Sequence, residues 1–474
     1  MEGVATIAEK LAEYSVSASL KGDRALASAM RIYALDTLAV TLAGTVAPSS
    51  APVTRAILAA SGKAEATVMG VGKVTSAWDA ALANGAFAHA LELDDDHRVA
   101  VLHPGAVVVP AALAAAEAEG CSGLTFLRAL YVGYEVMCRL GEVFRGSQFH
   151  HGVHPTALCG VFGAAAAAAV TMDLDRDAFV RALGIAGTQA SGLTEWRADG
   201  SWIKRLHPGR AAHSGVLAAR LAREGFTGPA TIFEGEGGFF NAFSFGEQID
   251  PDCMTRDLGK DHHALGTAIK PYPCCRFEHG AIDLALAANE SGIAASDIDA
   301  ANIRIYSTGV LTYHHRPKSA VDAQFNVPYA VAIALLRGRI GLSDFTDEAI
   351  RDGDVLALCD RVHVKEDPDF SARYPQEYCV ELDLALKNGD RRTLFSDCPS
   401  GDPVAAQYRG RPELLGQEVE RKVSALLTEV GFADRTAPLK ACVDSLADAP
   451  DLGQLSALFA KNAPVETPLR RSRA

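Results

Sequence analysis

The stretch PTALCGVFGAAAAAAV, residues 155–170, decides the fold. Alanine and its apolar neighbours favour helix, and Pro155 suits a first helical turn, where the N–H that proline lacks is not needed. The most apolar part, residues 160–170, is too short and too rich in alanine to span a bilayer. The stretch therefore predicts one helix of a helical array, and we expect no membrane-spanning segment.

Similar helical patterns extend outward from this stretch over residues 1–265. Apolar residues recur at three- and four-residue spacing, and glycines stand where several segments stop. The expected helices cover residues 8–16, 24–44, 76–93, 110–120, 123–144, 155–169 and 210–225. We predict that this part of the chain is a large all-α domain.

The pattern changes at about residue 266, where segments that alternate with period two appear. The sequence over 378–395 alternates on both sides of Asn388-Gly389, the strongest short signal for a β-hairpin. Residues 303–308 and 361–367 also read as strands, and 327–338 as one buried helix. We predict a smaller α+β domain over 266–400, inserted into the helical fold. Residues 401–474 are predicted to be helical again and to pack back on the first domain. The fold class is therefore mainly α.

Composition and charge narrow the class of protein. Of 474 residues, 49% are hydrophobic and 22% charged, which is typical of a globular protein with a large core. The formal net charge of −13 argues against a nucleic-acid partner, and only the tail LRRSRA, residues 469–474, is locally basic. Ten cysteines follow no paired framework, and the first residues lack a signal-peptide pattern. We expect a reduced, cytoplasmic protein that contacts neither nucleic acid nor membrane.

His-Pro dipeptides precede Ala-rich helical runs at three places, His103-Pro104, His154-Pro155 and His207-Pro208. Each histidine would then lie at or next to the N-cap of a helix, whose free N–H groups and partial positive charge attract anions. Three cations stand near these dipeptides in the sequence: Lys204, Arg210 and Lys270. If the three helix ends converge, they form a pocket for a di- or tricarboxylate. The alternative is that each dipeptide only caps a helix.

The acidic stretch LELDDDH, residues 91–97, raises a second question. It places Glu92, Asp94, Asp95 and Asp96 within five positions, followed by His97. Such runs are usually solvated turns, because charged clusters mostly face water. The other interpretations are an acid-base apparatus or a metal site.

A metal site finds little support in the sequence. His150, His151 and His154 stand close together, but no HExxH or CxxC pair is present. Cys274 and Cys275 are adjacent and lack the spaced partners of an iron–sulfur cluster, so they are interpreted as wall residues. Motifs for nucleotide binding and for serine hydrolases are also missing. We therefore expect no metal and no organic cofactor.

Several motifs, taken together and in order, resemble the MmgE/PrpD family over nearly the whole chain. They are HALELDDDH (89–97) followed by LHPG (102–105), GVHPTALCGVFGAAAAAA (152–169), IKRLHPGRAAHSGVLAARLAREGFTGPATIFEGEGGFF (203–240), IKPYPCCRFEHGAID (269–283) and FNVPYAVAIALLRGRI (325–340). That family includes 2-methylcitrate dehydratase, cis-aconitate decarboxylase and iminodisuccinate epimerase. The resemblance implies a large helical domain, a smaller α+β lid domain, a homodimer and chemistry without a cofactor.

The resemblance also implies roles for individual residues. His103 and His154 match histidines that perform acid-base chemistry, and Lys204 matches a catalytic lysine that holds a substrate carboxylate. Lys270 matches a second carboxylate-binding lysine. Tyr329 matches a tyrosine placed to donate a proton or a hydrogen bond; without the resemblance it would be interpreted as a core aromatic.

Further residues are expected to line the substrate pocket: Glu92, Asp96, His207, Arg210 and Cys275. Some positions depart from the family pattern. Glu92 stands where Asp is common, and Asp96 where Thr is frequent. Gly105 replaces a Ser, and Cys275 replaces the additional His of the decarboxylase branch. An added carboxylate and lost polar donors make a pocket less favourable for a third substrate carboxylate.

The leading functional hypothesis is a cofactor-independent carbon–oxygen lyase that dehydrates a 2-methylcitrate-like hydroxy di- or tricarboxylate. One of the two histidines would remove the proton next to a carboxylate, and Tyr329 or the other histidine would protonate the departing hydroxide. The alternatives are an epimerase of a dicarboxylate and a cis-aconitate-type decarboxylase. Outside this chemistry stand a metal-dependent hydrolase using Asp94 to His97 and His150 to His154, and a helical binding protein without catalysis.

Overall fold

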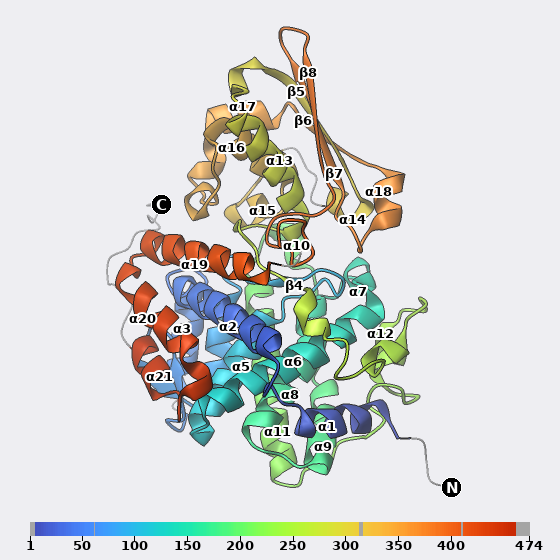
Figure 1. The fold of residues 1–474 in the computed structure, drawn as a ribbon, viewed down its shortest axis with the longest axis vertical. Coiled ribbons are helices and arrows are strands. Elements are labelled where there is room, and N and C mark those ends of the chain that lie inside the picture. Colours follow the sequence, from blue (N-terminus) through green and yellow to red (C-terminus); the bar gives the residue numbers. More distant parts are fainter. Residues whose placement is uncertain (1–4, 61, 312–315, 409–410, 461–474) are drawn as a thin grey trace.

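The computed structural model describes residues 5–60, 62–311, 316–408 and 411–460, and Figure 1 shows their arrangement. Helices dominate, as the sequence predicts. The first part of the chain forms α1 (Ile7–Ser17), α2 (Arg24–Gly44), α3 (Ser50–Ala59), α4 (Ala77–Ala88), α5 (Gly105–Glu119), α6 (Gly123–Phe144), α7 (Ser147–His150), α8 (Pro155–Thr171), α9 (Arg176–Gly187), α10 (Trp196–Asp199), α11 (Ile203–Arg223) and α12 (Phe239–Phe243). Two short antiparallel pairs accompany them: β1 (Ala66–Val68) with β2 (Lys73–Thr75), and β3 (Asp96–His97) with β4 (Thr267–Ala268).

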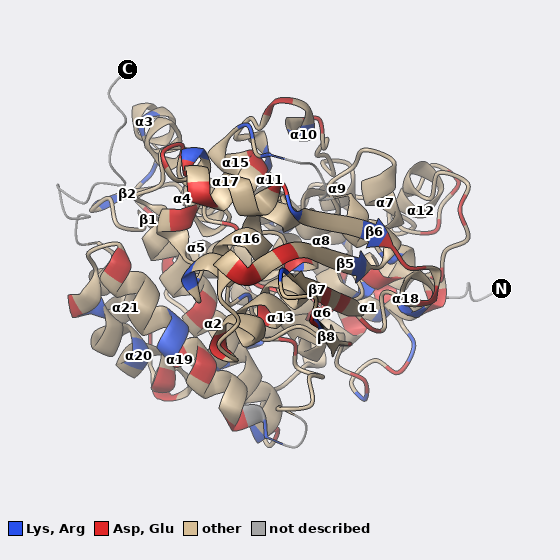
Figure 2. Ribbon diagram, turned by 90° about the horizontal axis from the view of Figure 1, so that it is seen from above, with Lys and Arg blue, Asp and Glu red and all other residues tan. Residues whose placement is uncertain are grey.

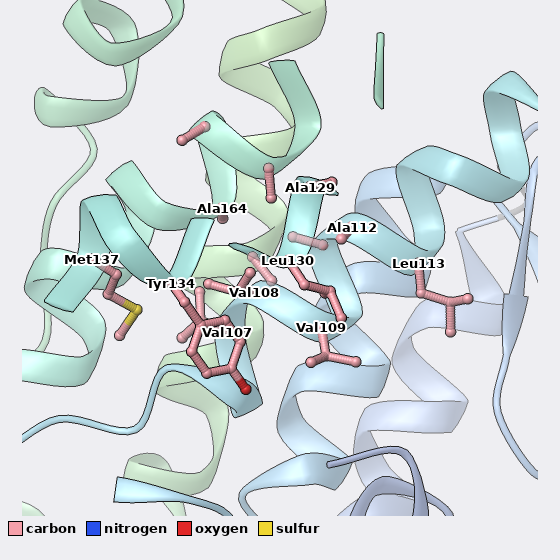
Figure 3. Packing of buried hydrophobic residues seen from close by; sticks show 14 of the residues in the cluster. Val107, Val108, Val109, Ala112, Leu113, Ala129, Leu130, Tyr134, Met137 and Ala164 are labelled. Carbon is pink, nitrogen blue, oxygen red and sulfur yellow. The ribbon is translucent and has the colours of Figure 1, made fainter. Parts of the chain in front are cut away.

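The centre of the helical part is the contact of α5, α6 and α8, shown in Figure 3. Every residue of α8 is buried, so the alanine-rich stretch 155–170 lies inside the protein. Small residues bring the helices close together. A Cβ on Gly133 of α6 would lie 2.9 Å from the Gly163 carbonyl oxygen of α8, and a Cβ on Gly163 would meet the Gly133 carbonyl at 2.9 Å. Glycine at both positions is what allows the two backbones this approach.

Helix α2 is long and apolar enough to cross a membrane by length and composition alone. In the structure, most of its apolar window is buried among neighbouring helices. Helix α4 and helix α19 (Pro412–Glu429) both pack against α2.

The later part of the chain forms a four-stranded sheet with its own hydrophobic core. The strand order is β6 (Val362–Glu366), β5 (Ile298–Ile305), β7 (Val380–Leu386), β8 (Arg391–Ser396), with β5 and β6 parallel and the other pairs antiparallel. The predicted hairpin is confirmed, because β7 pairs with β8 around Asn388 and Gly389. The helices of this part are α13 (His279–Glu290), α14 (Ser307–Val310), α15 (Ala320–Ala323), α16 (Val327–Arg337), α17 (Gly353–Cys359) and α18 (Pro368–Arg373). In Figure 1 the sheet and α13, α16 and α17 stand above the helical part.

The last helices return to the first core. Helix α19, α20 (Thr436–Asp444) and α21 (Gly453–Phe459) place Val419, Leu427 and Phe459 in the same buried cluster as α2 and α5. Lys422 of α19 pairs with the buried Asp36 of α2 at 2.6 Å and donates to the Leu93 carbonyl at 2.7 Å. The C-terminal helices therefore support the acidic stretch directly. The end of the predicted C-terminal segment, residues 461–474, lies outside the described residues.

Several boundaries differ from the sequence prediction. The helix expected over 76–93 ends at Ala88, and the one expected from 110 begins at Gly105. Helices α3, α7, α9, α10 and α12 were not predicted. The divisions at 265/266 and 400/401 stay predictions. Seen from above in Figure 2, acidic and basic residues are interspersed over the visible elements.

Candidate active site

The acidic stretch is buried, so its interpretation as a solvated turn is wrong. Glu92, Asp94, Asp95 and Asp96 are each at most 3% exposed. After α4 ends, the chain turns inward, and Glu92 adopts a left-handed conformation with φ 54°. That conformation is uncommon outside glycine and is often found at functional sites. The turn carries these carboxylates beneath α11 and the Lys270 segment.

A small cavity of about 50 Å³ collects most of the predicted residues. Its walls include Glu92, Asp96, His103, His154, Lys204, Lys270 and Cys275, together with Val101, Phe149, Pro155, Trp196, Arg276, Phe277 and Phe325. A larger cavity of about 760 Å³ shares Phe149, Trp196, Cys275, Phe277 and Phe325 with it. The small cavity therefore suits one end of a substrate, with the rest of the molecule in the larger space.

Two lysines face Glu92 inside this cavity. The Lys204 ammonium lies 2.5 Å and 2.6 Å from the two Glu92 carboxylate oxygens. The Lys270 ammonium lies 3.7 Å from Glu92 Oε2 and donates to the Glu92 carbonyl at 3.3 Å. Burial raises the pKa of Glu92, but Lys204, His89 and Lys270 outweigh it and lower the pKa to about 2. Glu92 is therefore an internal counter-anion that occupies part of the positive charge offered by the lysines.

A buried His–Asp pair stands behind this cluster. His89 Nδ1 lies 2.7 Å from Asp94 Oδ2, and His103 Nδ1 lies 3.5 Å from the same oxygen. Burial raises the pKa of Asp94, but neighbouring groups, with His89 first and Lys270 among them, together outweigh burial and hold the pKa below its usual range. Asp94 is thus an ionised carboxylate that orients two imidazole rings.

Hydrogen bonds select the tautomer of His103. Its Nδ1 lies 2.7 Å from the Asp95 carbonyl oxygen, which can only accept, so Nδ1 carries the proton and Nε2 has a free lone pair. Burial, with the nearby Lys270 charge, lowers the pKa of His103 well below its ordinary value. A neutral imidazole with a free nitrogen in the cavity is suited to act as a base.

A hydrogen bond joins the rings of His154 and His207. The two Nδ1 atoms lie 3.0 Å apart, so one donates and the other accepts, and the two rings hold complementary tautomers. Burial lowers the pKa of His154 well below its ordinary value, and it lowers the pKa of His207 to about 4. His207 therefore orients His154 and does not line the small cavity itself.

Asp96 behaves differently from its neighbours. Burial raises its pKa to about 7, although Lys270 and Arg276 act in the opposite direction. Its Oδ1 atom is buried and has no hydrogen-bond partner within the described residues. A carboxyl group that is partly protonated near neutral pH and lies at a cavity wall is a candidate proton donor.

Two of the three predicted helix ends converge on the cavity. His103 stands just before α5, and His154 is the N-cap of α8. The third prediction is wrong, because α11 begins at Ile203 and holds His207-Pro208 inside it. The first turn of α11 instead carries Lys204, which lies 5.1 Å from the Phe325 ring centroid.

Two predicted site residues lie elsewhere. The Tyr329 hydroxyl donates to the Asp344 carbonyl at 2.7 Å, and its ring packs in the second hydrophobic core. Arg210 is exposed and contacts His213 at 3.1 Å. Neither residue is a wall of the small cavity. These contacts match the interpretation of Tyr329 as a core aromatic.

The departures from the family pattern have physical consequences. Burial raises the pKa of the Cys275 thiol to about 12, so this wall residue is a neutral thiol and not a nucleophile near neutral pH. Gly105 donates its N–H to Asp95 Oδ1 at 2.8 Å. A Cβ at Gly105 would lie 2.3 Å from Thr37 Oγ1 and 2.7 Å from the Tyr134 hydroxyl. The packing around Asp95 therefore excludes a serine at this position without rearrangement.

Sequence reasoning missed several residues at or behind the cavity wall. Arg276 is buried, pairs with Asp402 at 3.3 Å and donates to the Ser400 carbonyl at 2.8 Å. His89 stands in the HALELDDDH motif but received no role, since a single histidine at the end of a helix carries no spacing signal. The aromatic walls Phe149, Trp196 and Phe325 come from three separate segments and have no common sequence pattern.

The histidines at the cavity offer one further possibility. Ring nitrogens of His89, His103 and His154 lie within 4.8 Å of one another, close enough to hold a metal ion. The Lys204 and Lys270 ammonium groups line the same cavity, and each repels a divalent cation. The ligand set suggested for a metal hydrolase is not brought together, because His151 pairs with Glu247 at 2.5 Å and His150 is exposed.

Two family models and several known proteins match this chain. The chain matches the MmgE/PrpD N-terminal domain over residues 9–252 and the MmgE/PrpD C-terminal domain over residues 272–447. It is 30% identical to a cis-aconitate decarboxylase-like protein of Aspergillus oryzae over 90% of this chain and 91% of that protein. It is 29% identical to human cis-aconitate decarboxylase over 82% and 80% of the two chains. Identity to 2-methylcitrate dehydratase of Escherichia coli is 24% over 53% and 54%. The chain belongs to the MmgE/PrpD family.

Proposed function

We propose that the protein is a lyase that dehydrates a hydroxy di- or tricarboxylate of the 2-methylcitrate type by removing the proton next to a carboxylate. The observation that supports this proposal most strongly is the pairing of neutral histidines with lysines at one cavity. His103 offers a free Nε2 lone pair there, while Lys204 and Lys270 attract carboxylate. A base beside a cation that stabilises an enolate is the requirement for this reaction.

In the proposed reaction, His103 takes the proton from the carbon next to the substrate carboxylate. The electron pair of that C–H bond becomes the C=C bond, the neighbouring C–O bond breaks, and hydroxide leaves. Asp96 supplies the proton that converts hydroxide to water, since its pKa of about 7 keeps it partly protonated. Lys204 and Lys270 hold the carboxylate and stabilise the enolate charge before elimination. The scheme uses no cofactor, and Tyr329 has no part in it.

The charge balance of the cavity bears on the substrate. Two lysines face two ionised carboxylates, Glu92 and Asp94, so the described cluster offers little net positive charge. Each further substrate carboxylate near Glu92 would be repelled. We therefore favour a substrate with two carboxylates over one with three.

Decarboxylation is the second candidate. Its support is the match over nine-tenths of the chain to a protein named cis-aconitate decarboxylase-like. The apolar walls Phe149, Trp196 and Phe325 would also disfavour a carboxylate relative to CO₂. Cys275 argues against it, because a neutral thiol is a weaker proton donor than the histidine of that branch.

Proton NMR in deuterated water tests both candidates. The enzyme is incubated with 2-methylcitrate, citrate, malate-type acids and cis-aconitate. New vinyl signals from a hydroxy acid establish dehydration, and loss of CO₂ from cis-aconitate establishes decarboxylation. If deuterium enters beside a carboxylate without net product, epimerisation would be favoured over both dehydration and decarboxylation.

Variants make this experiment specific. We expect His103→Ala to abolish turnover and His213→Ala, a half-buried histidine outside the cavity walls, to retain it. If the folded enzyme converts none of these acids, the proposed substrate class is wrong. Equal activity of folded His103→Ala would contradict the assignment of the base.

We also propose a cytoplasmic homodimer, which rests on composition and on the family resemblance. Light scattering during size-exclusion chromatography measures the assembly, and a single-chain mass at micromolar concentration would contradict it.

A further inference from the structure

A second cluster of potential ligands lies behind the active-site wall, outside the proposed reaction. It joins Glu142 of α6 to Cys253 of a 3₁₀ turn over Pro251–Met254 and to His263 of a second 3₁₀ turn over His263–Gly266. One ligand atom of each residue lies within 4.8 Å of the others. The three residues are well separated in the sequence, and only the fold brings them together.

The three ligand atoms are close enough to share one ion. His263 Nδ1 lies 3.0 Å from Glu142 Oε1, and Cys253 Sγ lies 3.9 Å from Glu142 Oε2. His263 Nδ1 is buried and close to the carboxylate, but within the described part of the chain it makes no hydrogen bond of acceptable geometry. The imidazole and the carboxylate are therefore near each other without pointing directly at each other, as ligands of a common ion do.

The surroundings hold this arrangement in place. Arg139 donates to the Cys253 carbonyl at 2.9 Å and to the Asp261 carbonyl at 2.6 Å, which ties both turns to α6.

We propose that Cys253 Sγ, His263 Nδ1 and the Glu142 carboxylate form a site for one divalent ion of the zinc class. Thiolate, imidazole and carboxylate together favour Zn²⁺ or Co²⁺ over Mg²⁺ or Ca²⁺, which prefer oxygen ligands only. Three protein ligands leave a fourth position for solvent. This site is distinct from the histidines of the proposed active site.

The site would stabilise the wall that carries Asp96. His97 Nε2 lies 2.8 Å from the His263 carbonyl and 3.4 Å from Glu142 Oε1, and His97 follows Asp96 in β3. Neighbouring residues of a strand point to opposite sides, so β3 separates the cavity from the proposed ion.

Titration of chelator-treated full-length protein with Co²⁺ tests the site. We expect one Co²⁺ per chain and a near-ultraviolet absorption from thiolate-to-cobalt charge transfer, which Zn²⁺ removes by displacement. Cys253→Ser should lose this absorption, and Glu142→Gln should weaken binding by about tenfold or more. Cys442→Ser, which changes a partly buried cysteine of α20, should behave like wild type.

Other outcomes would overturn the proposal. If the protein binds no Co²⁺, the proposal is wrong, and His263 and Glu142 form only an ordinary ion pair. Binding without the charge-transfer absorption, abolished by His103→Ala, would place the ion among the active-site histidines. Absorption that persists in Cys253→Ser would assign the ligand to another cysteine. Because Glu142→Gln keeps the thiol, it reports the site independently if Cys253→Ser fails to fold.

Discussion

Replacing Glu92 by Gln should lower the stability of the folded protein and raise its affinity for tricarboxylates. The carboxylate neutralises Lys204 and Lys270 in the folded protein, and its pKa falls from 4.5 to about 2. At about 1.4 kcal/mol per pKa unit, this shift corresponds to about 3 kcal/mol of folding free energy at neutral pH. We expect Glu92→Gln to lose about this amount at pH 7, because the two buried lysines lose one of the carboxylates that balance their charge.

The loss should depend on pH with a definite sign. A carboxyl group whose pKa is lowered by folding stabilises the protein above its unfolded pKa, and the contribution disappears as pH falls through the folded value. The difference between wild type and Glu92→Gln should therefore shrink as pH falls from about 4.5 toward 2. Urea unfolding at several pH values measures it.

The same variant should bind a third carboxylate better. Two like charges roughly 6 Å apart repel by about 3 kcal/mol at an effective dielectric constant of about 20. Removing the Glu92 charge should thus raise the affinity for citrate by about tenfold or more, measured by calorimetry. Glu117→Gln, a change of a largely buried glutamate on α5 outside the cavity walls, should leave citrate binding unchanged. Unchanged stability at pH 7, or no gain in citrate affinity, would refute this account of Glu92.

Three further predictions follow from neighbouring residues. Folding raises the pKa of Asp96 from 3.8 to about 7, so the native state retains a proton that the unfolded chain releases. The free energy of unfolding should fall as pH rises through this range, and turnover should decline above pH 7. Thermal unfolding and rate–pH profiles measure the two effects. Asp96→Asn should remove the decrease of stability with pH, and an unchanged decrease would contradict the assignment. Gly105→Ser should cost about 1 to 3 kcal/mol in urea unfolding because its Cβ meets Thr37, and Thr37→Ala should recover part of the loss; full stability of the single variant would disprove the clash. His207→Ala should lower kcat by about tenfold or more with a smaller effect on KM, since His154 lines the cavity beside the reacting groups and its tautomer is no longer selected; a change in KM alone would mean that His207 binds substrate.

The local elements of this protein could be predicted because their signals are local. Alanine-rich runs with three- and four-residue periodicity give α2, α6 and α8 nearly at their observed bounds, and Asn388-Gly389 gives the β7–β8 hairpin. His103 and His154 could be placed at helix starts, since proline at the next position is compatible with a first turn and little else in a helix. The α11 boundary was missed, because tertiary packing tolerates Pro208 inside that helix.

The chemistry of the site was decided by tertiary structure. By itself, the sequence determined which segments are helices and strands and which residue types carry acid-base chemistry. It did not determine that the acidic stretch is buried, because the charge that permits burial comes from far away: Lys204 and Lys270 lie 112 and 178 positions beyond Glu92. The roles of Asp96 and Tyr329 were likewise decided by contacts that no local signal reveals. Asp96 acquires its high pKa from burial among elements distant in sequence, and Tyr329 is held by the Asp344 carbonyl in the other core. Local propensity specifies backbone conformation, whereas pKa values and charge balance arise from groups that only the folded chain brings into contact.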